Sequence, residues 1–114
     1  MFAVDRPCFD RWVEEAWLQI PAFFRSRVKN VSIEVEETSR PSRRPILGLY
    51  VGVPLPERTS AESETPDRII LYKKNLEMVS DSEEDLRDQI RQTLWHELGH
   101  YFGMDEKGLR RRGY

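Results

Sequence analysis

The sequence predicts an α+β fold with an N-terminal helix, a small mixed sheet of three to four strands and a C-terminal helix. Three observations predict it: helical spacing of apolar residues near the N-terminus, extended apolar segments in the middle, and a second helical pattern near the C-terminus. The chain has 114 residues, which is enough for one domain and too few for two. We therefore expect a single domain over residues 1–114.

The first helix is predicted from the spacing of its apolar residues, which recur three and four positions apart. They are Phe9, Trp12, Val13, Ala16, Trp17 and Ile20. One stripe of this kind is typical of an amphipathic helix. Pro7 suits the first turn, and Pro21 cannot continue the helix. We interpret the two tryptophans as core residues rather than as a binding surface.

Three segments have the pattern of β-strands. Residues 31–36 alternate between apolar and polar side chains, as in a half-buried strand. Residues 46–53 are almost continuously apolar, so we expect them to form the most buried strand. Residues 68–74 supply a third strand. The polar segments between the strands, 38–45 and 57–67, are predicted to be loops.

Composition and charge exclude several classes of protein. The 18 basic and 20 acidic residues give a net charge of −2, which argues against a general nucleic-acid-binding surface. The single cysteine, Cys8, excludes an internal disulfide framework, and we interpret it as structural. There is neither a long apolar run nor a secretory signal pattern. We expect a soluble, cytoplasmic protein with no nucleic-acid or membrane partner.

Two groups of basic residues have an alternative interpretation as binding sites. Arg40, Arg43 and Arg44 lie in the first predicted loop, and four more cations fall in residues 107–114. A cluster of cations can contact phosphates or an acidic partner. We favour a solvated surface for both groups.

The C-terminal helix is predicted to begin after Ser82, which can cap it, and to run to about Phe102. Asp85 is an imperfect capping-box partner, and acidic residues favour the first turn. Apolar residues recur at helical spacing from Leu86 onward. Gly103 then follows, and glycine ends helices by taking a positive φ.

Both histidines of the chain lie on this predicted helix, in His96-Glu97-Leu98-Gly99-His100. A spacing of four residues places the two rings about 40° apart around the axis and about 6 Å apart along it. Their nitrogens can converge on one Zn²⁺, and Glu97 can reach an attacking water as general base. The alternative is that both are ordinary histidines, either on the helix surface or hydrogen-bonded in the core. The helical context and the nearby Gly103 favour the metal site.

A third ligand is expected soon after the helix. Fourteen residues follow His100, too few to supply a ligand from a second helix. Asp105 and Glu106 come directly after the predicted turn at Gly103. Both are therefore candidates.

The segment His-Glu-Leu-Gly-His-Tyr-Phe-Gly-Met-Asp-Glu at 96–106 resembles the H-E-x-x-H-x-x-G-x-x-(His/Asp/Glu) signature of zincins. It is most similar to the small bacterial zincin-like metallopeptidases called mini-zincins, and the similarity extends over nearly the whole chain. The resemblance implies a minimal zincin-like domain. It also implies one Zn²⁺ held by His96, His100 and Glu106, with Asp105 in reserve, Glu97 as general base and Gly103 as the turn.

The resemblance implies a zinc-dependent peptidase that hydrolyses peptide or protein substrates. The alternative is a catalytically weak or inactive zinc-binding module that recognises peptides or regulates a partner protein, and a protein partner is a possible completion of the cleft. We expect the substrate to lie extended along an exposed sheet edge, with residues 68–74 as the candidate strand. No residue is assigned to stabilise the oxyanion. Tyr50, Tyr72 and Tyr101 are interpreted as packing residues, and Tyr114 is the one tyrosine beyond the motif.

Overall fold

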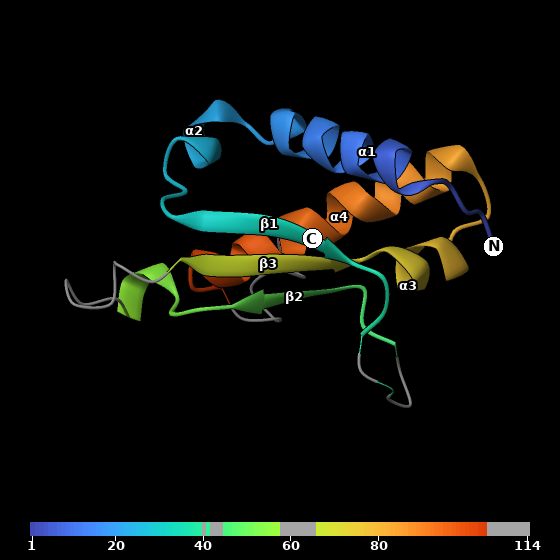
Figure 1. The fold of residues 1–114 in the computed structure, drawn as a ribbon. Coiled ribbons are helices and arrows are strands. Elements are labelled where there is room, and N and C mark those ends of the chain that lie inside the picture. Colours follow the sequence, from blue (N-terminus) through green and yellow to red (C-terminus); the bar gives the residue numbers. More distant parts are fainter. Residues whose placement is uncertain (40, 42–44, 58–65, 105–114) are drawn as a thin grey trace.

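The computed structural model describes residues 1–39, 41, 45–57 and 66–104. The helices, in chain order, are α1 (Arg6–Gln19), α2 (Ala22–Arg25), the 3₁₀-helix η1 (Leu55–Glu57), α3 (Lys73–Met78) and α4 (Glu83–Tyr101). The strands are β1 (Val31–Glu36), β2 (Gly48–Val51) and β3 (Asp67–Tyr72). In Figure 1, α1 and α4 lie together on one side of the three-stranded sheet. The predicted α+β class is confirmed.

The N-terminal helix forms where its apolar stripe predicts. Asp5 caps it by accepting a hydrogen bond from the Cys8 backbone N–H at 3.0 Å, and Pro7 lies in its first turn. Its buried residues are Phe9, Trp12, Val13 and Ala16. These pack in one core with apolar residues of β3, α3 and α4. Both tryptophans therefore serve the core, as expected, with Trp17 half-buried at its margin.

The sheet has the strand order β1-β3-β2, with β1 parallel and β2 antiparallel to β3. The strand predicted from 68–74 is therefore central and is not an edge, so that expectation is wrong. It is also shorter than predicted, because the chain enters α3 at Lys73. Burial follows from position: β3 is paired on both sides, and Ile69 and Leu71 are fully buried.

The strand predicted from 46–53 is not the most buried one, which is a second correction. It spans only Gly48–Val51 and lies at an edge, where Leu49 is 38 % and Val51 41 % exposed. Its apolar composition suits either a central strand or an edge strand. Which of the two it becomes depends on which strands lie beside it in the folded sheet. A local sequence pattern does not carry that information.

Two short helices, α2 and α3, were not predicted from the sequence. In α3, Lys73 and Glu77 form a buried ion pair at 2.9 Å. The Glu77 carboxylate also accepts a hydrogen bond from the Val4 backbone N–H at 2.8 Å, which holds the N-terminal segment against the core. Within the described residues, no helix is long and apolar enough to cross a membrane.

Both ends of α4 agree with the sequence prediction. Ser82 is the N-cap and accepts a hydrogen bond from the Asp85 backbone N–H at 3.1 Å. At the other end Gly103 has a φ of +87°. The Gly103 N–H donates a hydrogen bond to the His100 carbonyl, and the Met104 N–H donates one to the Gly99 carbonyl. Together these two bonds form the Schellman motif that ends many helices. The helix therefore ends at Tyr101, one residue after its second histidine.

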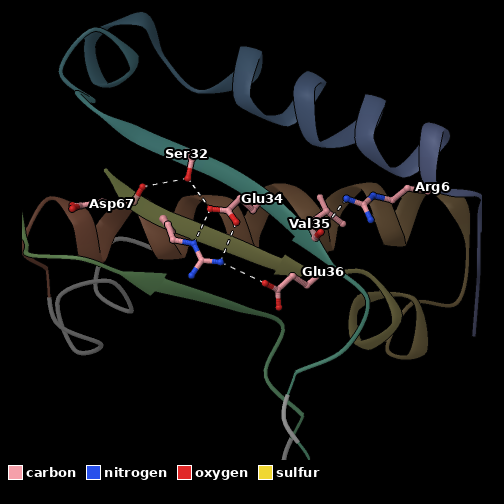
Figure 2. A network of polar contacts seen from close by, with 7 residues as sticks. Arg6, Ser32, Glu34, Val35, Glu36 and Asp67 are labelled. Atoms are coloured by element: carbon pink, nitrogen blue, oxygen red, sulfur yellow. Dashed lines mark hydrogen bonds and ion pairs between the residues drawn. The ribbon is translucent and has the colours of Figure 1, made fainter. Parts of the chain in front are cut away.

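A polar network covers part of the sheet face turned away from the helices (Figure 2). Arg68 donates two hydrogen bonds to Glu34, at 2.8 and 3.0 Å, and lies 3.5 Å from a carboxylate oxygen of Glu36. Ser32 donates to Glu34 at 2.8 Å. The hydrogen bonds from Arg68 and Ser32 lower the pKa of Glu34, and the Glu34 carboxylate raises the pKa of Arg68. The network ties β1 to β3.

The lowered pKa predicts how stability responds to acid. The Glu34 carboxylate makes its full contribution to the free energy of unfolding above its ordinary pKa of 4.5. That contribution is lost as the pH falls through the lower pKa of the folded state. The free energy of unfolding of the native chain should therefore fall more steeply below about pH 4.5 than that of a Glu34→Gln variant. Urea unfolding over this range measures both slopes. Glu14→Gln, which changes an exposed glutamate outside the network, is the control, and equal slopes in Glu34→Gln and the native chain would contradict the prediction.

Candidate metal centre

The two histidines lie one above the other on α4. Their ring centroids are 5.0 Å apart and their planes meet at 77°. Both side chains are half-buried. The helix thus places the pair as the four-residue spacing predicts, with one ring per turn on a common face.

Glu97 completes a group of three potential metal-binding side chains. One ligand atom from each of His96, Glu97 and His100 lies within 4.8 Å of the others. Two ligands of a tetrahedral zinc ion are separated by roughly 3.3 Å, so small side-chain rotations suffice to bring two of these atoms onto one ion. The two imidazoles are donors that zinc prefers, and the Glu97 carboxylate lies close enough to both to act on a water molecule beside the ion. The residues present therefore fit the ion that the motif implies.

Contact with β2 determines where this turn of α4 lies relative to the sheet. A Cβ atom added to Gly48 would lie 2.6 Å from Cγ2 of Thr93 and 3.4 Å from Cγ of Glu97. The absence of a side chain at Gly48 lets the strand lie directly on the helix turn that carries Glu97. Neither Gly48 nor Thr93 was predicted from the sequence to be a site residue. A glycine in an apolar strand is the available signal, because it often marks close approach of another chain segment.

Two cavities open on either side of Glu97 and His100, between α4 and β2. We call the first the glutamine cavity; its volume is about 550 Å³ and it is lined by Ile46, Leu47, Gly48, Leu49, Gln89, Gln92, Thr93, His96, Glu97 and His100. We call the second the Glu57 cavity; its volume is about 430 Å³ and it is lined by Leu49, Tyr50, Gly52, Pro54, Glu57, Glu97, His100, Gly103 and Met104. The two share Leu49, Glu97 and His100, so together they form one cleft along β2 with the candidate metal centre in the middle.

The tyrosines considered for the oxyanion differ in position. Tyr101 is fully buried, and its hydroxyl accepts a hydrogen bond from the Lys29 backbone N–H at 3.0 Å. Tyr72 is also buried. Tyr50 lines the Glu57 cavity, and its hydroxyl donates to the Asp67 carboxylate at 2.5 Å. Packing roles therefore suit Tyr72 and Tyr101, and Tyr50 is the one of these three that reaches the cleft.

Several predicted residues lie elsewhere or outside the described residues. Cys8 is half-buried on α1, where its sulfur accepts a hydrogen bond from Arg11 at 3.6 Å, and it is not part of the metal-binding group. Asp105 and Glu106 lie outside the described residues, as do Tyr114 and the two basic groups. The identity of the third ligand therefore stays a prediction.

Helix-borne histidines one turn apart, with a glutamate between them and an edge strand beside them, define the H-E-x-x-H class of candidate metal centres. The chain belongs to the zincin-like metallopeptidase family, whose model matches residues 28–114. A solved structure of a conserved hypothetical protein from T. thermophilus has the same fold, with a TM-score of 0.62 and 21 % sequence identity. The match covers 95 % of this chain and 99 % of that one. No curated protein matches the sequence.

Proposed function

We propose that this protein is a zinc-dependent peptidase that hydrolyses peptide bonds with Glu97 as the general base. The observation that carries the proposal is the His96–Glu97–His100 group, with its ligand atoms within 4.8 Å of one another at the centre of a cleft. Membership of the zincin-like metallopeptidase family supports the same class of reaction.

The proposed roles follow from side-chain chemistry. His96 and His100 would hold the ion through one imidazole nitrogen each, and Glu106 or Asp105 would supply a carboxylate. When bound, zinc polarises the substrate carbonyl and makes a water molecule more acidic. Glu97 takes a proton from the attacking water and delivers it to the nitrogen of the leaving amine. Burial suits this role: Glu97 is only 8 % exposed, so bulk water competes little for its carboxylate.

We propose β2, in place of residues 68–74, as the strand that binds the substrate. In the described part of the chain, β2 pairs through one edge with β3 and with no strand through the other. Both cavities border this strand. An extended peptide added to the free edge would form main-chain hydrogen bonds independent of its sequence and would pass over Glu97. The substrate is therefore proposed to be an extended peptide or a protein segment.

The position of β2 at an edge of the described sheet also supports the second candidate function. A sheet edge binds an extended peptide whether or not a bond in that peptide is then cleaved. A catalytically weak or inactive zinc-binding module could use the same cleft to recognise peptides or to regulate a partner protein. The two functions differ in one measurable respect, which is hydrolysis by zinc-loaded protein.

The proposal is tested by combining metal analysis with a cleavage assay. Purified protein reconstituted with zinc should contain one ion per chain and cleave a mixed peptide library, as followed by mass spectrometry. A chelator should abolish cleavage, and added zinc should restore it. Glu106→Gln should weaken zinc binding by more than the roughly 10- to 100-fold that is typical of losing a residue that only supports a ligand, and Asp105→Asn should have much less effect. Bound zinc without cleavage of any peptide would favour the recognition module, and failure to bind zinc would refute both functions.

A further inference from the structure

The two halves of the cleft differ in charge, and this difference bears on substrate choice. Apart from the residues of the metal centre, the described side chains that line the glutamine cavity are apolar or neutral. Among the described residues that line it, the Glu57 cavity adds one carboxylate, that of Glu57. Among the described residues that line either cavity there is no lysine or arginine.

The carboxylate of Glu57 is available to a ligand. In the part of the chain that the structure describes, no ion pair or side-chain hydrogen bond reaches it, and its backbone N–H is bonded to the Pro54 carbonyl at 2.9 Å. That bond belongs to the short helix η1, which fixes the backbone of Glu57 beside the cleft. Several other exposed acids are already paired with a neighbouring cation, as Asp10 is with Arg6 at 2.8 Å. An unneutralised carboxylate on a cavity wall attracts a cationic group and repels an anionic one.

The direction of β2 indicates on which side of the cleaved bond the cation would lie. The strand runs from Gly48, at the glutamine cavity, toward Val51 and the Glu57 cavity. Antiparallel pairing is the more stable arrangement for a strand added to a free edge. A peptide bound antiparallel to β2 therefore has its N-terminal half over the Glu57 cavity and its C-terminal half over the glutamine cavity.

We propose that Glu57 determines specificity by selecting peptides with a cationic side chain on the N-terminal side of the scissile bond. The glutamine cavity takes an uncharged side chain on the C-terminal side, because a charge placed there would lose water without gaining a partner. This inference rests on the proposed peptidase function and on the assignment of β2 as the binding strand. Because Glu57 is solvent-exposed, its effect is that of a surface ion pair and weakens with salt.

The test compares peptides that differ at one position. A peptide that the enzyme cleaves is synthesised with lysine, glutamine or glutamate at each of the two positions before the scissile bond. For the native chain at low salt, kcat/KM at one of these positions should be up to about fivefold higher for lysine than for glutamine, and lower still for glutamate. Glu57→Gln should remove this order, Glu57→Lys should reverse it, and high salt should reduce it. Glu14→Gln, an equal charge change on α1, should leave the order unchanged.

A binding measurement separates this inference from the proposed function. Zinc-loaded Glu97→Gln protein is titrated with the same peptides by fluorescence anisotropy, where no hydrolysis is needed. The same order of affinities, lost in a Glu57→Gln/Glu97→Gln double variant, would support the role of Glu57 even if the native chain cleaved nothing. Cleavage or binding that is insensitive to peptide charge, or an order that persists in Glu57→Gln, would overturn the inference and leave the peptidase proposal intact.

Discussion

Replacing Glu97 with glutamine should lower the rate of peptide cleavage by about 10²- to 10⁴-fold and leave zinc binding nearly unchanged. Glutamine has almost the same shape as glutamate, so it fills the same buried position between α4 and β2. Its amide cannot accept the proton of the attacking water. The two histidines are untouched and keep their place one turn apart on α4.

The measurement is kcat/KM for a peptide that the native chain cleaves, together with zinc content per chain. Glu57→Gln is a matched control, because it makes the same chemical change in the same cleft and should alter kcat/KM by about fivefold at most. A Glu97→Gln variant that cleaves at the native rate would show that another group acts as the base. Loss of zinc in this variant would show instead that Glu97 helps to hold the metal.

Replacing Gly48 with alanine should produce the second large effect, through the contact between β2 and α4. The new methyl group would lie 2.6 Å from Cγ2 of Thr93 and 3.1 Å from the carbonyl oxygen of Ile70. The first contact requires either the Thr93 side chain to rotate or β2 and α4 to separate, and the second requires a small shift of β2 against β3. We expect a loss of about 1–3 kcal/mol in the free energy of unfolding. Because Glu97 lies on the same helix turn, we also expect kcat/KM to fall by about 10- to 100-fold.

A second substitution shows whether the contact with Thr93 is the cause. Thr93→Ser removes the Cγ2 atom that the new methyl group would strike. The double variant Gly48→Ala/Thr93→Ser should therefore recover part of the stability and activity lost in Gly48→Ala, with an interaction energy of about 0.5–3 kcal/mol. Urea unfolding and the cleavage assay give two independent readouts. Additive effects would show that Ile70, rather than Thr93, limits the approach of the strand.

The features that could be predicted from the sequence are those made by residues close together along the chain. The apolar stripe of α1 and the cap at Ser82 act within one or two helical turns. The pairing of His96 with His100 is likewise a property of one helix turn, so it follows from the spacing alone. Gly103 was predictable because ending a helix with a positive φ favours glycine.

The strand order could not be predicted, because hydrogen bonds between strands join segments distant in the sequence. The apolar run at 46–53 indicated the most buried strand, yet β2 is an edge strand. Residues 68–74 were expected at an edge, yet β3 receives β1 on one side and β2 on the other. Because β2 and not β3 lies at the edge of the sheet, the strand proposed to bind the substrate changed from β3 to β2. The edge position of β2 also made Gly48 and Glu57 relevant to the cleft.

The sequence by itself determined the α+β class, the two long helices and the helix turn that carries His96, Glu97 and His100, since each depends on local spacing and capping. Only the tertiary structure decided that β2 is an edge strand of the described sheet, that it lies beside that turn and that Gly48 allows the two to touch. It also decided that Glu57 faces the cleft. The physical reason is that these contacts join segments 40 or more residues apart in the chain. Their geometry arises from packing the whole core, which no short pattern encodes.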